Sequence, residues 1–174
     1  MNNYKEVVEF LFEQYPSYQK KGVDAYKPDL SNIHGICKII GNPQNKLKFI
    51  HVAGTNGKGS TVGFLAHGLM TAGFRVGTFT SPHLIDYTER FCINNVSISR
   101  TDFVHFYKVV AALEDFNRYT EFEILSLMSF LYFKHHMPDF VIYETGLGGN
   151  LDATNLVSPH LSIITKIDLD HQTI

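Results

Sequence analysis

The hydrophobic positions of this chain follow two different periods, which together predict an alternation of helices and strands. In several stretches, apolar residues recur three and four positions apart, the spacing of a helix with one buried face. Short, nearly continuous apolar runs between these stretches predict buried strands. The expected helices are Tyr4–Phe12, Leu30–Ile40, Phe64–Met70, Phe103–Leu113 and Phe122–Tyr132, and the expected strands are Leu47–Ala53, Phe74–Thr80, Asp139–Glu144 and Leu161–Ile167.

Strands that alternate with helices favour an α/β fold whose mostly parallel sheet is flanked by helices. Phe91–Ile98 departs from this order, since Asn94-Asn95 in its middle is typical of a tight turn and predicts a short hairpin. Ser17–Pro28 is polar and contains helix breakers, which predicts a loop. A length of 174 residues fits one compact domain that buries roughly 70% of its unfolded surface.

Composition and charge narrow the class of protein. A formal net charge of −2 shows no basic excess, so we expect no nucleic-acid partner and no anionic membrane surface. Cys37 and Cys92 are isolated and have no metal or redox spacing, which indicates small buried residues in a reducing compartment. We find neither a targeting signal nor an apolar run of membrane-spanning length, and we therefore expect a cytoplasmic protein.

The clearest chemical signal is the glycine-rich stretch His51–Thr61 between the first strand and the following helix. Its glycines allow backbone N–H groups to turn inward, and the helix N-terminus adds a partial positive charge. Lys58 supplies an ammonium group for phosphates, and Ser60 or Thr61 supplies a hydroxyl for a phosphate oxygen or Mg²⁺. The stretch predicts an ATP phosphate site.

The match to the standard phosphate loop is imperfect. That motif has glycine at the position of Val52 and serine or threonine at the position of Gly59. A plain strand-to-helix connection is the alternative interpretation, but it does not require a lysine among its glycines.

Polar groups also follow the other expected strands. Ser81 follows the second, Glu144 ends the third, and Asp168, Asp170 and His171 follow the fourth. Because ligands of open parallel sheets bind at the carboxyl ends of the strands, the set predicts a site for Mg-ATP. Taken singly, each has a simpler explanation: a surface carboxylate for Glu144, turn chemistry for Ser81, and a solvated loop for the last three.

The Gly-Thr-Asn-Gly-Lys-Gly-Ser sequence resembles the ATP-binding loop of the Mur ligase superfamily. Further blocks narrow the resemblance to the N-terminal part of the bifunctional dihydrofolate synthase/folylpolyglutamate synthase family. These are Thr-Ser-Pro-His-Leu at 80–84, Glu-Arg at 89–90, Thr-Glu-Phe-Glu at 120–123, Gly-Leu-Gly-Gly-Asn-Leu-Asp-Ala-Thr-Asn at 146–155 and Leu-Asp-His at 169–171.

The resemblance implies a Mur-ligase-type ATP-binding domain and assigns roles to particular residues. It implies ATP phosphate contacts from Thr55, Asn56, Gly57, Lys58, Gly59, Ser60 and Thr61. It implies catalytic roles for Lys58, Glu144 and His171, with Ser81, Glu144 and His171 holding Mg²⁺. It implies pteroate contacts from Asp29, Leu30, Ser31, Asn32, Thr120, Glu121, Phe122, Glu123, Leu151, Asp152 and Ala153. Asp29 or Ser31, and Thr120, also have the positions of helix caps.

The reaction of that family joins L-glutamate to dihydropteroate or folate with the use of ATP. An acyl phosphate forms first, so no protein nucleophile is expected. Two alternatives stay open: another Mur-type amino-acid ligase, and a non-catalytic nucleotide-binding remnant.

Two departures from the family pattern affect these expectations. Asn150 stands where members usually carry arginine, and the sequence stops at Ile174. We therefore expect an incomplete ATP-binding domain over 1–174, without the C-terminal glutamate-binding domain, and with little or no ligase activity by itself. An uncovered strand at Leu161–Ile167 is also expected to permit self-association through the sheet edge.

Overall fold

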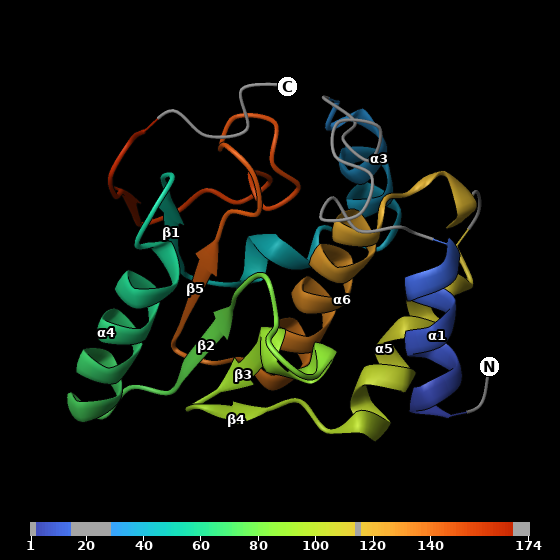
Figure 1. Cartoon of the computed structure of the whole chain (residues 1–174), viewed down its shortest axis with the longest axis horizontal. Helices are drawn as coiled ribbons and strands as arrows, with labels where there is room; N and C mark the ends of the chain where they lie inside the picture. Colours follow the sequence, from blue (N-terminus) through green and yellow to red (C-terminus); the bar gives the residue numbers. More distant parts are fainter. Residues whose placement is uncertain (1–2, 15–28, 114–115, 169–174) are drawn as a thin grey trace.

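The computed structural model describes residues 3–14, 29–113 and 116–168, so the predicted loop Ser17–Pro28 lies outside the described residues. A single six-stranded sheet, ordered β4-β3-β2-β5-β1-β6, organises the molecule (Figure 1). The parallel strands are β1 (Phe49–Ala53), β2 (Val76–Phe79), β5 (Phe140–Glu144) and β6 (Leu161–Ile164). Their carboxyl ends therefore meet at one edge of the sheet, as the sequence predicts.

The predicted hairpin is confirmed. β3 (Phe91–Ile93) pairs antiparallel with β2 and with β4 (Val96–Ser97). Asn94 and Asn95 have φ angles of 49° and 61°, so both turn residues adopt the left-handed conformation that a two-residue hairpin requires. The Asn94 side chain also accepts a 2.8 Å hydrogen bond from the amide of Val76, which ties the turn to β2.

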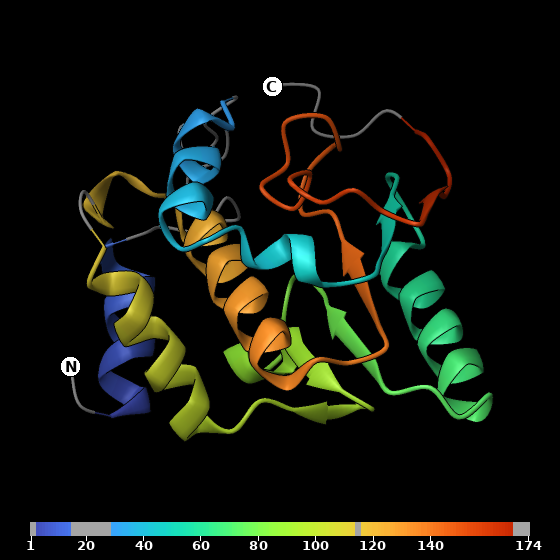
Figure 2. The same ribbon diagram turned by 180° about the vertical axis from the view of Figure 1, so that it is seen from behind.

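Helices cover both faces of the sheet (Figures 1 and 2). One face carries α4 (Lys58–Thr71). The opposite face carries α6 (Glu121–His136), with α5 (Arg100–Ala111) and α3 (Ser31–Ile39) packed against it and α1 (Tyr4–Gln14) packed on α5. Short 3₁₀ turns are η2 (Pro43–Lys46), η3 (Tyr87–Arg90) and η4 (Phe116–Arg118). This layered arrangement confirms the predicted α/β class.

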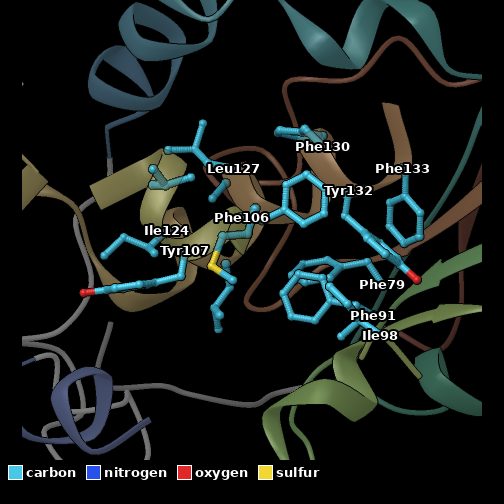
Figure 3. Packing of buried hydrophobic residues seen from close by; sticks show 14 of the residues in the cluster. Phe79, Phe91, Ile98, Phe106, Tyr107, Ile124, Leu127, Phe130, Tyr132 and Phe133 are labelled. Carbon is cyan, nitrogen blue, oxygen red and sulfur yellow. The ribbon is translucent and has the colours of Figure 1, made fainter. Parts of the chain in front are cut away.

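Alternation along the strands divides the core in two. Ile50, Val52 and Ile142 pack under α4, whereas Phe49 and Tyr143 pack against α6 in the larger, aromatic-rich cluster. Figure 3 shows part of that cluster, where the aromatic rings of α5, α6 and the hairpin meet. Since Glu144 follows Tyr143 by one residue, its side chain lies on the α4 face, beside the glycine-rich loop.

Two helices bury more side chains than the spacing of their apolar residues predicts. In α4, Leu65, Leu69 and Met70 pack against the core as predicted, but Phe64 is 80% exposed. Val62 and Ala66 are the fully buried positions. In α6 the predicted Leu125, Met128 and Tyr132 are buried, and so are most other positions, because the helix lies between the sheet and the outer helices. A helix surrounded in this way has no solvent face for a periodic pattern to mark.

Several boundaries also differ from the sequence predictions, and β1 and β2 each begin two residues later than expected, at Phe49 and Val76. β6 ends at Ile164, not Ile167, and Lys166 forms only an isolated bridge with Asn56. The cap position of α3 is Leu30, which makes no side-chain cap bond. The Asp29 carboxylate instead accepts hydrogen bonds of 2.8 Å from the Ser31 amide and 2.6 Å from its hydroxyl, and these bonds lower the pKa of Asp29.

Candidate functional site

The turn between β1 and α4 has the backbone geometry of an anion-binding loop. Gly54 and Gly57 have φ angles of 131° and 82°, a left-handed region that glycine adopts without strain. Gly57 is the N-cap of α4, Lys58 is its first residue, and no side chain caps this helix. The first turn of α4 therefore presents backbone amides to an anion, at the positive end of the helix dipole.

The predicted cation and hydroxyls lie on the same turn. The Lys58 ammonium donates hydrogen bonds to the carbonyls of Gly54 at 2.9 Å and Thr55 at 3.3 Å. The Thr61 hydroxyl donates to the Gly57 carbonyl at 2.8 Å, whereas Ser60 is exposed. Of the two candidate hydroxyls, Ser60 is therefore the better placed to reach a ligand.

The chain that follows β6 supports the loop from behind. The Thr55 amide donates to the Lys166 carbonyl at 2.8 Å, and the Thr165 hydroxyl donates to the Asn56 carbonyl at 2.8 Å. The Thr55 hydroxyl lies 3.0 Å and 3.1 Å from the amide and carbonyl of Asp168. These hydrogen bonds fix the backbone of the loop. Thr55 therefore supports the predicted phosphate site by holding the loop in place.

Glu144 is the carboxylate of the site. It is only 5% exposed, and its Oε2 accepts a hydrogen bond of 3.2 Å from the Ser81 amide. Burial raises the pKa of Glu144, while the amides of Ser81 and Gly59 and the charge of Lys58 act in the opposite direction. A side chain at Gly59 would lie 3.7 Å from this carboxylate. Lys58, Ser81 and Glu144 thus come together, as predicted from the ends of three strands.

These donors fit a magnesium-bound triphosphate. Amides and an ammonium suit phosphate oxygens, and a carboxylate with a nearby hydroxyl suits Mg²⁺. Within residues 3–14, 29–113 and 116–168, no three His, Cys, Asp or Glu residues lie close enough to form a metal site alone. Mg²⁺ usually keeps several waters and takes phosphate oxygens, so it needs only one or two protein ligands. The predicted ligand His171, and Asp170 with it, lie outside the described residues.

The predicted pteroate segment Thr120–Glu123 forms the first turn of α6. Because α6 runs antiparallel to β5, this turn lies near the carboxyl end of that strand (Figure 1). Thr120 and Glu123 form the expected capping box, in which the Thr120 amide donates to the Glu123 carboxylate at 2.7 Å. Glu121 is buried and accepts a 2.6 Å hydrogen bond from the Tyr87 hydroxyl. The Phe122 ring would lie 2.7 Å from a Cβ at Gly146, so this glycine permits the close approach.

The second predicted pteroate segment, Leu151–Ala153, lies in the loop after β5. Leu151 is partly exposed and Ala153 is buried. Asp152 is buried too, and its carboxylate accepts the amides of Gly146 and Leu147 at 2.8 and 2.9 Å. The carboxylate of Asp152 therefore holds the shape of this loop, whatever else it contacts.

The third segment, Asp29–Asn32, opens α3. Figure 1 shows that the start of α3 lies at the same end of the molecule as the carboxyl ends of β1 and β5. The structure thus brings the predicted pteroate segments to the end of the sheet that carries the phosphate loop.

The sequence does not reveal the residues that support the site from positions other than the ends of strands. His51 is buried on β1, where its Nε2 lies 2.8 Å from the Thr154 hydroxyl. Arg90 belongs to the Glu-Arg sequence at 89–90, for which the sequence predicts no role. Neither residue has a motif spacing, because their partners lie far away along the chain.

The fold and the site define a nucleotide-binding α/β domain of the Mur ligase type. Comparisons with known proteins make the assignment specific. No family model matches the chain. The chain is 45% identical over 155 residues to a dihydrofolate synthase/folylpolyglutamate synthase of Bacillus subtilis, covering 85% of this chain and 36% of that protein.

Solved structures agree with this relative. A folylpolyglutamate synthase complex with AMPPCP and folate matches with a TM-score of 0.87 and 36% identity, over 99% of this chain and 42% of the other. A bifunctional enzyme with Mn, AMPPNP and L-glutamate bound matches with a TM-score of 0.84 and 34% identity, over 97% and 39%. The chain belongs to the dihydrofolate synthase/folylpolyglutamate synthase family, and it spans about two fifths of the length of these relatives.

None of the helices in the described ranges combines the length and the hydrophobicity that crossing a bilayer requires.

Proposed function

We propose that this chain supplies the Mg-ATP and pteroate sites of an ATP-dependent ligase that adds L-glutamate to dihydropteroate or folate. The observation that carries the proposal is the convergence of Lys58, Ser81 and Glu144 beside the amides that open α4. Relatives of the same family are solved with AMPPCP and folate, and with Mn, AMPPNP and L-glutamate. We also propose a cytoplasmic location, because the free cysteines Cys37 and Cys92 are typical of a reducing compartment.

The residues of the site divide the work of phosphoryl transfer. The carboxylate of the acceptor attacks the γ-phosphorus of ATP, which gives an acyl phosphate and ADP. The glutamate amine then attacks the acyl carbon, and an amide forms as phosphate leaves. Lys58 and the amides of residues 56–60 hold the phosphates and offset negative charge in the transition state.

Glu144, Ser81 and His171 are the residues proposed to hold Mg²⁺. When bound, the metal supplies positive charge next to the transferred phosphoryl group. The raised pKa of Glu144 comes from burial, and a cation brought next to its carboxylate would favour the ionised form. A bound cation would therefore stabilise the ionised carboxylate of Glu144.

The acceptor would lie between α3, α6 and the loop after β5. We assign its contacts to the segments Asp29–Asn32, Thr120–Glu123 and Leu151–Ala153. Phe122 is only partly buried, and its ring offers an apolar face next to the Glu144 end of β5. We propose that L-glutamate binds mainly to a region that corresponds to the part of the relatives outside the matched two fifths.

Calorimetric titration with Mg-AMPPCP tests the nucleotide site. Lys58→Ala removes the ammonium and is expected to weaken binding by about tenfold or more, because one charge-assisted contact to phosphate is lost. Lys38→Ala, at an exposed lysine in the last turn of α3, is the matched control and should bind like the wild type. Equal affinities for all three proteins would refute the site.

Thermal shifts with candidate acceptors test the substrate class. Dihydropteroate is expected to raise the melting temperature in the presence of Mg-AMPPCP. A cell-wall precursor that did so instead would favour another Mur-type ligase. Nucleotide binding with no response to any acceptor would favour a non-catalytic nucleotide-binding protein.

A further inference from the structure

The Glu89-Arg90 pair has no role in the site described so far, yet it holds the loop that carries Ser81. We call residues 81–86 the Ser81 segment. The Glu89 carboxylate accepts hydrogen bonds from the amides of Leu84, Ile85 and Asp86, at 2.9, 3.0 and 2.9 Å. The far half of the Ser81 segment is therefore fixed by Glu89, and the part nearest Ser81 needs another support.

Arg90 provides that support from both sides of Ser81. Its carbonyl accepts a 3.1 Å hydrogen bond from the Thr80 amide, and its Nε donates a 2.9 Å hydrogen bond to Nδ1 of His83. The guanidinium carbon lies 5.3 Å from the centre of the Tyr87 ring. Only 8% of Arg90 is exposed, so these contacts form away from competing water.

The same cluster reaches the first turn of α6. The Tyr87 ring lies against His83, with ring centres 4.3 Å apart and planes tilted by 41°, and its hydroxyl donates the 2.6 Å hydrogen bond to Glu121. Burial lowers the pKa of Arg90, and the negative charge of Glu121 opposes this shift. A guanidinium costs more to bury than an apolar side chain, so its directional contacts are the reason to expect a positioning role.

We propose that Arg90 is a positioning residue for the metal site. Through His83 it holds the Ser81 segment so that Ser81 stays against Glu144, where its amide lies 3.2 Å from the carboxylate. Through Tyr87 and Glu121 it keeps that segment in register with the first turn of α6. The proposal rests on the proposed function, since it concerns the same cation site.

The test uses two measurements. Electron paramagnetic resonance gives the Mn²⁺ affinity of the AMPPCP-loaded protein, and a titration in the presence of a metal chelator gives the affinity for AMPPCP alone. Arg90→Lys keeps the charge but loses the planar donor that reaches His83. We expect Mn²⁺ affinity to fall about tenfold, the scale of one hydrogen bond to a charged group, with metal-free AMPPCP affinity unchanged. A general loss of structure would weaken both.

Arg100→Lys is the matched control. Arg100 also lies over a tyrosine ring, 5.0 Å from the centre of Tyr4, and bonds to the loop at Asp86 over 2.9 Å. Arg100 acts at the end of the Ser81 segment that is far from Ser81. The Mn²⁺ affinity of the Arg100→Lys variant should therefore stay within about twofold of that of the wild type.

His83→Phe keeps a ring beside Tyr87 and removes the acceptor for Arg90. It should weaken Mn²⁺ binding as Arg90→Lys does, and the double variant should bind no worse than the weaker single variant. This variant also decides the matter if Arg90→Lys does not fold. Wild-type Mn²⁺ affinity in either folded variant overturns the positioning role alone, whereas a wild-type protein that binds no Mn²⁺ overturns the proposed function together with it.

Discussion

Glu144 shows how the site is set at the scale of one residue. A carboxylate that is nearly removed from water is costly unless charges and donors surround it. Here the Lys58 ammonium and the Gly59 amide do so from the start of α4, and the Ser81 amide does so from the loop after β2. The carboxylate is thus held in position before a cation or a phosphate arrives, and binding needs little rearrangement.

His51 is the buried histidine next to this site. Its Nε2 lies 2.8 Å from the Thr154 hydroxyl, and that hydroxyl donates to the buried Asp152 carboxylate, so His51 is the donor. Burial lowers the pKa of His51 below its ordinary value of 6.5, and the negative charge of Asp152 only partly offsets this. The imidazole is therefore neutral in the folded protein near pH 7.

The lowered pKa makes stability depend on pH. Below pH 6.5 the unfolded chain protonates His51 while the folded protein resists, so the free energy of unfolding falls as the pH drops toward the folded pKa. Urea unfolding between about pH 7 and about pH 5 measures this slope.

His51→Gln is the control for that slope. Glutamine can still donate to Thr154 but does not titrate in this range. We expect its stability to fall less steeply than that of the wild type. Identical slopes would show that His51 does not titrate differently in the two states.

At the scale of elements, the phosphate loop depends on β6 as much as on α4. A Cβ at Gly54 would lie only 2.1 Å from the Thr165 hydroxyl oxygen and 3.1 Å from its amide nitrogen. Only glycine lets the loop approach the chain after β6 so closely at a φ of 131°.

Gly54→Ala is therefore expected to destabilise the protein by about 1–3 kcal/mol and to weaken Mg-AMPPCP binding. Gly63→Ala, in the exposed middle of α4 with open space at its Cβ, should instead add up to about 1 kcal/mol. Urea denaturation and calorimetry of the two variants compare these effects. A Gly54→Ala protein as stable as Gly63→Ala would contradict the packing argument.

The helices show what a pattern can and cannot predict. The stripes of α3 and α5 are confirmed, since Ile33, Ile36, Phe103 and Phe106 are buried, because those helices pack through one face. α6 is covered from the sheet and from the outer helices, so its polar Ser126 and Ser129 are buried with the rest. Periodicity carries no information about a second covered face.

At the scale of the whole molecule, β6 ends the sheet within the part of the chain that the structure describes. It pairs with β1 on one side, and two of its apolar side chains are open to solvent, with Leu161 48% and Ile164 66% exposed. Unpaired backbone groups beside apolar side chains form a surface on which another strand can pair. We propose that copies of this chain associate through β6.

Light scattering after gel filtration tests this proposal over a range of protein concentrations. Ile164→Lys places a charge on β6 and should shift the protein toward the monomer. Val96→Lys is the control, because Val96 is 70% exposed on β4 at the opposite edge of the sheet. A wild-type monomer at high concentration would refute the association.

The sequence by itself determined the α/β class, the glycine-rich loop that opens α4, and the polar residues at or just after the ends of β2 and β5. These are local properties, because each is defined by residues that are neighbours in the sequence: the glycines and the lysine of one loop, or a polar residue next to an apolar run. Only the tertiary structure decided what lies behind them: Thr165 under the loop, His51 beside Thr154, and Arg90 against His83 and Tyr87. Such contacts form when the sheet order brings distant segments together, and a buried polar pair has no spacing along the sequence from which to predict it.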